Sequence, residues 1–221
     1  MPRPRVHDLD RVLDVAEELA VSAGPAAVTI RALSDATSMS NGALYHAFAS
    51  RAGLLGRAWV RAANRFLVLQ RDAVERALTG GHTAVADAAG VTDAATVGDA
   101  AAVDAVVAAA LCPALFFDQN PSSAQFLLTV PRSELLRSGE VPAEVARELR
   151  ELDDALGAIF IRLARGLWNR ADKPALVLIR DSVVGLPTAL LLRDNRIPDD
   201  AARERLAAAV WAVLTIPPAN P

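Results

Sequence analysis

The stretch Leu33–Phe48, LSDATSMSNGALYHAF, predicts a short helix, a tight turn and a second short helix. In the second helix, Leu44 and Phe48 lie four residues apart and therefore share one face. Because an α-helix turns about 100° per residue, Gly42 and His46 fall roughly opposite that face. A helix that presents a small residue and hydrogen-bonding side chains can enter the major groove of DNA. The pattern therefore predicts a helix-turn-helix whose outer face suits DNA.

The composition predicts an all-α protein with a sizeable core. The chain has 221 residues, of which 52% are hydrophobic but only 5% aromatic, so small aliphatic side chains must fill that core. Helix-forming Ala, Leu, Arg and Glu dominate, and the alternating pattern of β-strands is nearly absent. We expect an N-terminal three-helix helix-turn-helix domain in residues 1–56, followed by a larger helical bundle in residues 57–221.

Caps, prolines and apolar spacing place the expected helices. Thr29, Ser40 and Ser50 are expected N-caps, because a hydroxyl can accept a hydrogen bond from a free backbone N–H at a helix start. The helices are expected over residues 8–22, from 30 onward, 41–48, 51–78, 99–117, 122–137, 142–170, 174–193 and 199–214. Pro113 should kink one of them and Pro131 should disturb another. The stretch from Ala77 to about Gly98 has few large apolar side chains and should form weak helix or loop.

The charges are unevenly distributed along the chain. Its formal net charge is −3, yet residues 1–66 hold eight arginines against six acidic residues. A mildly basic N-terminal part on an acidic body suits a protein that contacts phosphate with one end. Random scatter of charges is the alternative interpretation.

Other features limit the possible functions. Cys112 is the only cysteine, which excludes an intrachain disulfide or a cysteine-based metal site; either a redox role or a buried structural thiol is open to it. The N-terminus lacks the apolar segment of a signal peptide, and no uninterrupted apolar run is long enough to span a membrane. We therefore expect a cytoplasmic protein.

The N-terminal quarter resembles the DNA-binding domain of the tetracycline-repressor (TetR) family of bacterial regulators. The resemblance rests on Val28–Arg31 with Leu33, on Ser40–Phe48, and on Ser50-Arg51 with Leu54-Leu55. It covers about 60 residues; the rest matches only in being helical and of suitable length. Two positions depart from the family pattern: Ser38 stands where members usually have glycine, and Asn41 where a basic residue is frequent. These departures bear on affinity more than on the fold.

The resemblance implies a set of DNA-binding residues, each with a second interpretation. The set comprises Thr29, Arg31, Ser40, Asn41, Gly42, Ala43, Tyr45, His46 and Arg51. Gly42 and Ala43 would allow close approach to base edges, or would merely pack against the preceding helix. Tyr45 and His46 would donate to phosphates, although Tyr45 could instead be partly buried core. The other residues stand near helix starts, which favour phosphate, but Thr29 and Ser40 could act only as caps.

The resemblance also implies a homodimer that binds a palindromic DNA operator, because one such module makes few contacts. It places the dimer contact on the last long helices of the C-terminal domain. The candidate interface residues, which could equally be ordinary core, are Leu156, Phe160, Leu163, Ile179, Val183, Gly185, Leu186 and Leu190.

A small-molecule effector pocket in the C-terminal bundle follows from the same resemblance. The candidate lining residues, again with a core alternative, are Phe66, Leu69, Phe116, Phe117, Phe126 and Trp168. Residues 77–131 contain no Lys or Arg, which favours a neutral or cationic apolar effector over an anionic one. Effector binding would lower operator affinity by favouring one of two states. Repression is the family's usual role, and activation is the alternative.

Two other classes of function compete with a DNA-binding regulator. A helical-bundle enzyme is disfavoured, because the sequence has no nucleophile motif, no glycine-rich phosphate loop and no Glu-x-x-His pair. No cofactor, catalytic residue or metal site is predicted. A helical interaction module without DNA binding is supported only by the departures at Ser38 and Asn41.

Overall fold

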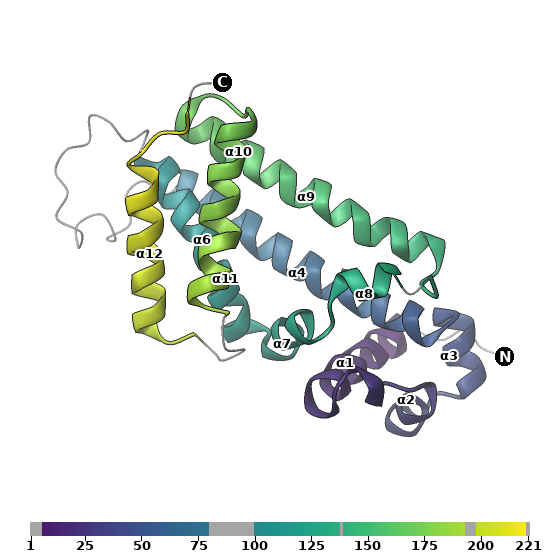
Figure 1. Cartoon of the computed structure of the whole chain (residues 1–221). Helices are drawn as coiled ribbons and strands as arrows, with labels where there is room; N and C mark the ends of the chain where they lie inside the picture. Colours follow the sequence, from purple (N-terminus) through teal and green to yellow (C-terminus); the bar gives the residue numbers. More distant parts are fainter. Residues whose placement is uncertain (1–5, 80–99, 138, 193–197, 220–221) are drawn as a thin grey trace. The chain divides into compact units, whose positions relative to one another are not determined.

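The structure, a computed structural model, describes residues 6–79, 100–137, 139–192 and 198–219. Within these ranges every regular element is a helix and none is a strand (Figure 1), which confirms the predicted all-α fold. Most of the stretch expected to be weak helix or loop, from residue 80 to Gly98, lies outside the described residues. The chain divides into two compact units, each formed by two separate segments.

Unit 1 comprises residues 1–65 and 120–153. Its helices are α1 (Val6–Ala23), α2 (Ile30–Thr37), α3 (Asn41–Phe48), α7 (Pro121–Thr129) and α8 (Arg132–Arg137), with the first parts of α4 (Arg51–Thr79) and α9 (Ala143–Trp168). Helix α1 contacts α2 and α7, and α2 contacts α3. The predicted domain boundary at residue 56 does not coincide with this unit, which also recruits a segment from the middle of the chain.

The three predicted N-caps of unit 1 are confirmed. The hydroxyl of Thr29 accepts a hydrogen bond from the Ala32 amide at 3.1 Å, and that of Ser40 accepts one from the Ala43 amide at 3.2 Å. The Ser50 hydroxyl accepts from the Gly53 amide at 2.9 Å. These bonds satisfy amides that the helix itself leaves free, which helps the eight-residue helices α2 and α3 to form.

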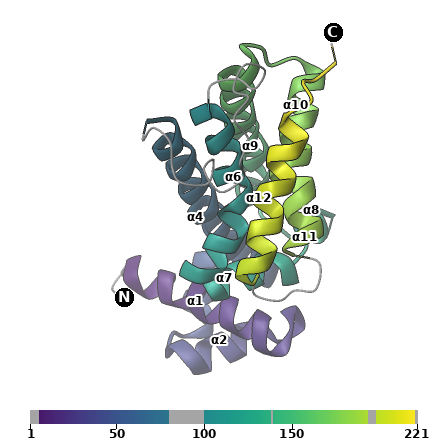
Figure 2. The same cartoon turned by 90° about the vertical axis from the view of Figure 1, so that its left-hand side faces the viewer.

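Unit 2 comprises residues 66–119 and 154–221. Its own helices are α6 (Ala100–Gln119), α10 (Lys173–Arg180), α11 (Leu186–Leu190) and α12 (Asp200–Leu214). Helix α6 lies alongside α12 and α11 (Figure 2). Its buried side chains are alanines, valines, Cys112 and two phenylalanines, so small aliphatic groups fill this core as the composition predicts.

Helix α6 is the one helix of the described residues that is long and apolar enough to cross a membrane. Its mean hydropathy reaches 2.1 over an 18-residue window, although Asp104 interrupts the apolar run. However, 61% of that window is buried inside the protein, which is typical of the central helix of a bundle.

The expected helix over residues 174–193 is interrupted. Helices α10 and α11 are joined by a π-helical turn, Asp181–Gly185, in which the Leu186 amide donates to the Asp181 carbonyl. Pro187 follows directly and has no N–H to continue the regular α-helical bonds. The wider turn keeps the helix continuous up to this proline. Similarly, Pro131 divides the expected helix over residues 122–137 into α7 and α8.

Candidate nucleic-acid interface

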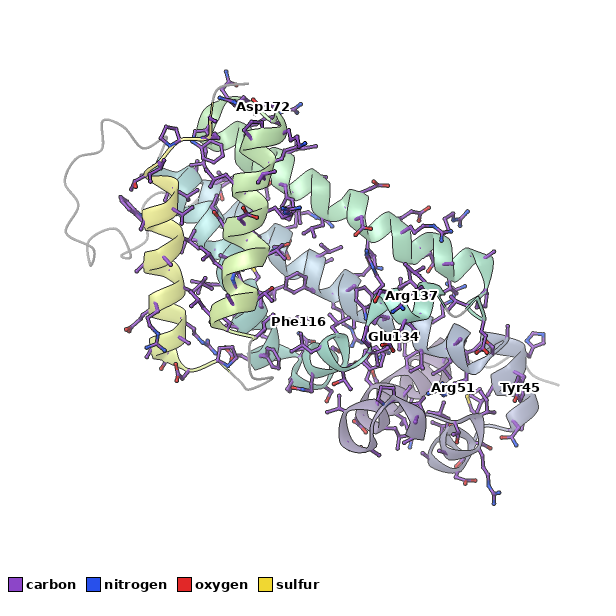
Figure 3. The ribbon with its side chains drawn as sticks, in the orientation of Figure 1. Tyr45, Arg51, Phe116, Glu134, Arg137 and Asp172 are labelled. Carbon is purple, nitrogen blue, oxygen red and sulfur yellow. The ribbon has the colours of Figure 1, made fainter. Side chains whose placement is uncertain are left out.

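Helix α3 divides into a buried face and an exposed face. Leu44 and Phe48 are buried, as predicted. On the other side Asn41, Gly42 and His46 are exposed, and 55% of the Tyr45 surface is accessible (Figure 3). Tyr45 is therefore not part of the core, and its hydroxyl is free to donate to a partner outside the chain.

Gly42 has no structural reason within the chain to be small. A Cβ atom added at this position would meet no other group within 4 Å. Glycine in a helix is less favourable than alanine by about 1 kcal/mol, so the chain would be more stable with alanine there. The interpretation that Gly42 merely packs against α2 is wrong. Ala43, its neighbour, is half-buried.

The turn between α2 and α3 adopts the left-handed conformation at Ser38, with φ 59°. Two hydroxyls support this turn from α2: Ser34 donates to the Met39 carbonyl at 2.6 Å, and Thr37 donates to the Leu33 carbonyl at 2.6 Å. Serine here costs about 1 kcal/mol relative to glycine. The flanking hydrogen bonds hold the geometry despite that cost.

The start of α2 presents two predicted DNA-binding residues. Thr29 is exposed, and its hydroxyl already caps the helix. Arg31, two residues further along, is exposed, and no hydrogen bond or ion pair of its side chain is found among the described residues. A helix N-terminus with a neighbouring free guanidinium favours phosphate binding.

Arg51 has a different environment from the one predicted. Its Nε donates to the Val28 carbonyl at 2.6 Å, and its Nη2 donates to the Pro25 carbonyl. Both carbonyls belong to the short connection between α1 and α2, where Pro25–Ala27 forms a 3₁₀ turn. The guanidinium is therefore engaged with the backbone, and phosphate binding by Arg51 stays a prediction.

A buried polar network joins α1, α4 and α7 of unit 1. Glu17 is only 2% exposed, and both of its carboxylate oxygens have partners. Oε1 accepts from Arg61 at 2.7 Å, and Oε2 accepts from the Ser123 hydroxyl at 2.6 Å. Arg61 also binds Asp14 at 2.7 Å. Sequence analysis missed this network, although Asp14 and Glu17 recur on one face of α1 and arginines recur every four residues on α4.

A second set of contacts fixes α4 against α9 in unit 1. Arg57 binds Glu148 at 2.8 Å and Glu144 at 3.1 Å. Glycine allows the two helices to approach closely, since a Cβ at Gly56 would lie 2.7 Å from Val145 Cγ1. The first turns of α4, directly after α3, are therefore held from the side by α9.

The six predicted effector-binding aromatic and aliphatic residues do not form one site. Phe116 (Figure 3) and Phe117 are buried, and Phe66 meets Phe116 edge to face at 5.6 Å between ring centroids. Phe126 is fully buried and belongs to unit 1, whereas the other five residues belong to unit 2.

A cavity of about 410 Å³ lies within unit 2. Alanines and leucines of α4 and α6 line it, together with Arg76, Asp104 and Arg203. None of the six predicted residues, including the half-buried Leu69 and Trp168, lines this cavity. Arg203 is engaged with Asp118 through two hydrogen bonds of 2.7 Å each.

The predicted dimer residues separate by exposure. Leu163, Ile179 and Val183 are at most 2% exposed within one chain, so they are core residues and present no surface to a second copy. Leu190 and Gly185 are exposed, whereas Leu156, Phe160 and Leu186 are half-buried. Two exposed valines that the prediction omitted, Val177 and Val184, lie on the same α10–α11 segment.

Cys112 is a buried thiol on α6. Burial raises its pKa to about 12, although the charge of Arg76 acts in the opposite direction. A thiol with so high a pKa is protonated at neutral pH and is therefore unreactive toward oxidants. In the described part of the chain, no three histidine, cysteine or acidic side chains gather as metal ligands would.

Comparison with known proteins places these features in a family. Residues 12–58 match the profile described as "Bacterial regulatory proteins, tetR family". No curated protein sequence matches the chain. The TetR family transcriptional regulator PfmR from Thermus thermophilus has a TM-score of 0.59 and 20% identity, covering 93% of this chain and 97% of its own.

Two further solved structures have the same fold over nearly their whole length. A tetR-family regulatory protein from Rhodococcus RHA1 has a TM-score of 0.62 and 16% identity, covering 98% of this chain and 100% of its own. The multidrug binding protein EbrR, complexed with imidazole, has a TM-score of 0.54 and 15% identity, covering 98% of each chain.

The family match falls on unit 1 residues that build the helix-turn-helix, and the structural likeness extends over both units. The matched family is one of bacterial regulatory proteins, and the solved structures of PfmR and of the Rhodococcus RHA1 protein are described as tetR-family regulators. Residues 12–58 therefore form a helix-turn-helix domain of the kind described as "Bacterial regulatory proteins, tetR family", and the solved structures show that the fold of those regulators extends over the rest of the chain.

Proposed function

We propose that this protein is a homodimeric, ligand-responsive transcriptional repressor that binds a palindromic DNA operator through α3. The observation that carries the proposal is the exposed face of α3, where Gly42 is small for no reason internal to the chain. A glycine in open space on a recognition helix lets the backbone approach base edges closely. Ala43, beside it, is of a size to meet a thymine methyl group.

The neighbouring polar residues are suited to phosphate rather than to bases. Tyr45 and His46 are exposed on α3 and donate hydrogen bonds that position the helix without reading sequence. Arg31 supplies a cation beside the N-terminus of α2, and Thr29 and Ser40 mark helix starts whose dipoles favour anions. Asn41, at the first position of α3, would bind phosphate by a hydrogen bond where a basic residue is frequent in the family.

Two copies are required for useful specificity, and α10–α11 offers the surface for their contact. Val177, Val184 and Leu190 are 38–41% exposed on this one segment, and Gly185, between Val184 and Leu190, permits close helix approach. Two recognition helices would then enter successive major grooves about 34–36 Å apart. Val184→Asp is expected to give monomers in sedimentation velocity, whereas Val68→Asp, on the exposed part of α4, should leave the dimer intact.

The effector is proposed to bind within unit 2 and to be apolar. The 410 Å³ cavity has a wall of small aliphatic side chains, and Asp118 offsets the charge of Arg203. Asp104 and Arg76 carry opposite charges in the same wall, so the neutral class of effector fits better than the cationic class. EbrR, with the same fold, is a multidrug binding protein. The effector would release the operator by binding one conformational state more tightly.

The proposal is tested by selecting DNA fragments with the purified protein and titrating the selected duplex against salt. We expect a palindromic site whose binding constant falls linearly on a log–log plot, with a slope of about −0.9 per phosphate contact. A helical interaction module without DNA binding would select nothing at low salt, and that result would refute the proposal. A DNA-binding role also implies a cytoplasmic location.

A further inference from the structure

We infer that Arg51 is a positioning residue, which holds the start of α2 in place for DNA rather than contacting phosphate itself. The inference rests on the proposed DNA-binding function and assigns a role within that site. Arg51 is the first residue of α4, yet its side chain reaches back to the connection between α1 and α2 (Figure 3).

Arg51 holds two backbone carbonyls with one guanidinium, an arrangement called the clamp below. Its Nε donates to the Val28 carbonyl at 2.6 Å, and its Nη2 donates to the Pro25 carbonyl. The Pro25 carbonyl also accepts from the Val28 amide at 3.3 Å, so one guanidinium closes both ends of this turn. Hydrogen bonds from a charged donor are about twice as strong as neutral ones.

The clamped residues lead directly into the phosphate-binding start of α2. Val28 is fully buried and is followed by Thr29, the N-cap of the helix. The Leu33 amide donates to the Thr29 carbonyl at 3.0 Å, which completes the first turn. If the Val28 carbonyl loses its partner, the position of this turn relaxes, and Thr29 and Arg31 lose their alignment with phosphate.

Arginine is required for this role, whereas a phosphate contact would accept lysine. The guanidinium offers a planar fork of donors that reaches two carbonyls at fixed angles. A lysine ammonium keeps the positive charge but lacks that fork. The two possible roles of Arg51 therefore predict different outcomes for the same conservative substitution.

The experiment compares R51K and R51Q with R31K and R31Q, in the full-length protein, on the selected duplex. We expect R51K and R51Q to lose affinity alike, by about tenfold, with the salt slope of the wild type. Arg31 is the control, because its side chain has no intramolecular partner among the described residues. R31K should bind nearly as the wild type does, and R31Q should make the salt dependence less steep by about 0.9 in slope. The inference would be overturned if R51K bound DNA with wild-type affinity while R51Q showed a less steep salt dependence.

A second measurement separates this inference from the proposed function. Amide hydrogen exchange at Ala32 and Leu33 is followed without DNA in the wild type, R51K and R51Q. The clamp predicts about tenfold faster exchange at these two amides in both variants. If both variants exchange these amides at the wild-type rate, the positioning role of Arg51 is refuted even if the protein binds DNA. If the wild-type protein binds no DNA, only the proposed function is refuted.

Discussion

The interior of unit 1 and the interior of unit 2 are stabilised by different kinds of interaction. In unit 1 the buried polar side chains of Glu17 and Ser123 bond to each other across helices, and Arg61 completes the network. In unit 2 the described buried polar side chains, Gln70 and Ser182, bond only to backbone carbonyls. The buried side chains of α6 itself are alanines, valines, Cys112 and two phenylalanines.

The difference follows from what each unit has to do. Helices α2 and α3 have eight residues each and bury few large side chains, so apolar packing alone cannot fix their direction. Charged hydrogen bonds are directional, and DNA recognition requires a fixed direction. The charged pairs described in unit 2 lie at its surface, and its interior is filled mainly by small apolar side chains, which suits a unit proposed to adapt to a ligand.

The largest expected effect comes from breaking the network of unit 1. Glu17→Ala removes the most buried of the three acidic partners of Arg61 and leaves the more exposed Asp10 and Asp14. Removing one partner of a buried pair costs about 3–5 kcal/mol. Urea unfolding monitored by circular dichroism measures the loss. Glu18→Ala, one residue along on the exposed side of α1, should change stability by less than about 0.5 kcal/mol. Equal effects of the two variants would contradict the comparison.

The interior of unit 2 is expected to protect Cys112. Because burial raises the pKa of this thiol to about 12, the reactive thiolate at pH 8 is about a thousandfold rarer than for a thiol at its ordinary value. Alkylation by iodoacetamide should therefore be slow in the native protein and fast in urea. Rapid alkylation of the native protein would show that water reaches this core.

Glycine-to-alanine substitutions distinguish tight from open helix positions. At Gly53 in unit 1, a Cβ would lie 2.2 Å from the Phe48 carbonyl oxygen, so Gly53→Ala should cost about 1–3 kcal/mol. At Gly157 in unit 2, a Cβ would meet nothing within 4 Å, and Gly157→Ala should stabilise the protein by about 0.5–1 kcal/mol. Thermal unfolding of both variants gives the sign of each stability change. A Gly53→Ala protein as stable as the wild type would show that α4 is not packed tightly against the end of α3.

The smallest expected effect is that of an exposed ion pair in unit 2. Hydrogen bonds from Arg162 lower the pKa of Glu75, whose side chain is 46% exposed. A carboxyl with a lowered folded-state pKa stabilises the fold above its unfolded-state pKa and loses that contribution as pH falls. Glu75→Gln should therefore cost less than about 1 kcal/mol at pH 7, and this cost should vanish as pH falls through the lowered folded-state pKa of Glu75. A larger loss, or one that persists in acid, would contradict this assignment.

Local sequence signals predicted the caps and the core face of the helix-turn-helix. Thr29, Ser40 and Ser50 cap as expected because capping involves a side chain and an amide only three residues apart. Leu44 and Phe48 are buried because helical periodicity alone determines that they share a face. Such signals need no knowledge of distant parts of the chain.

Contacts between distant residues could not be predicted in the same way. Regular periodicity from Ile179 and Val183 would bury Leu186 and Leu190. Pro187 and Leu191 are buried instead, because the π-helical turn shifts the buried face by one residue. A basic residue at a helix start predicts phosphate binding, yet Arg51 finds backbone carbonyls instead. Partner choice for a long side chain depends on which elements the fold brings near it.

The central claim is that the exposed face of α3 reads DNA, and Gly42→Ala tests it most directly. Stability and DNA affinity are measured on the same protein, with Gly157→Ala as the matched control. We predict that both variants are more stable than the wild type by about 0.5–1 kcal/mol, and that only Gly42→Ala binds the selected duplex at least about tenfold more weakly. Unchanged DNA affinity of a stabilised Gly42→Ala protein would contradict the claim.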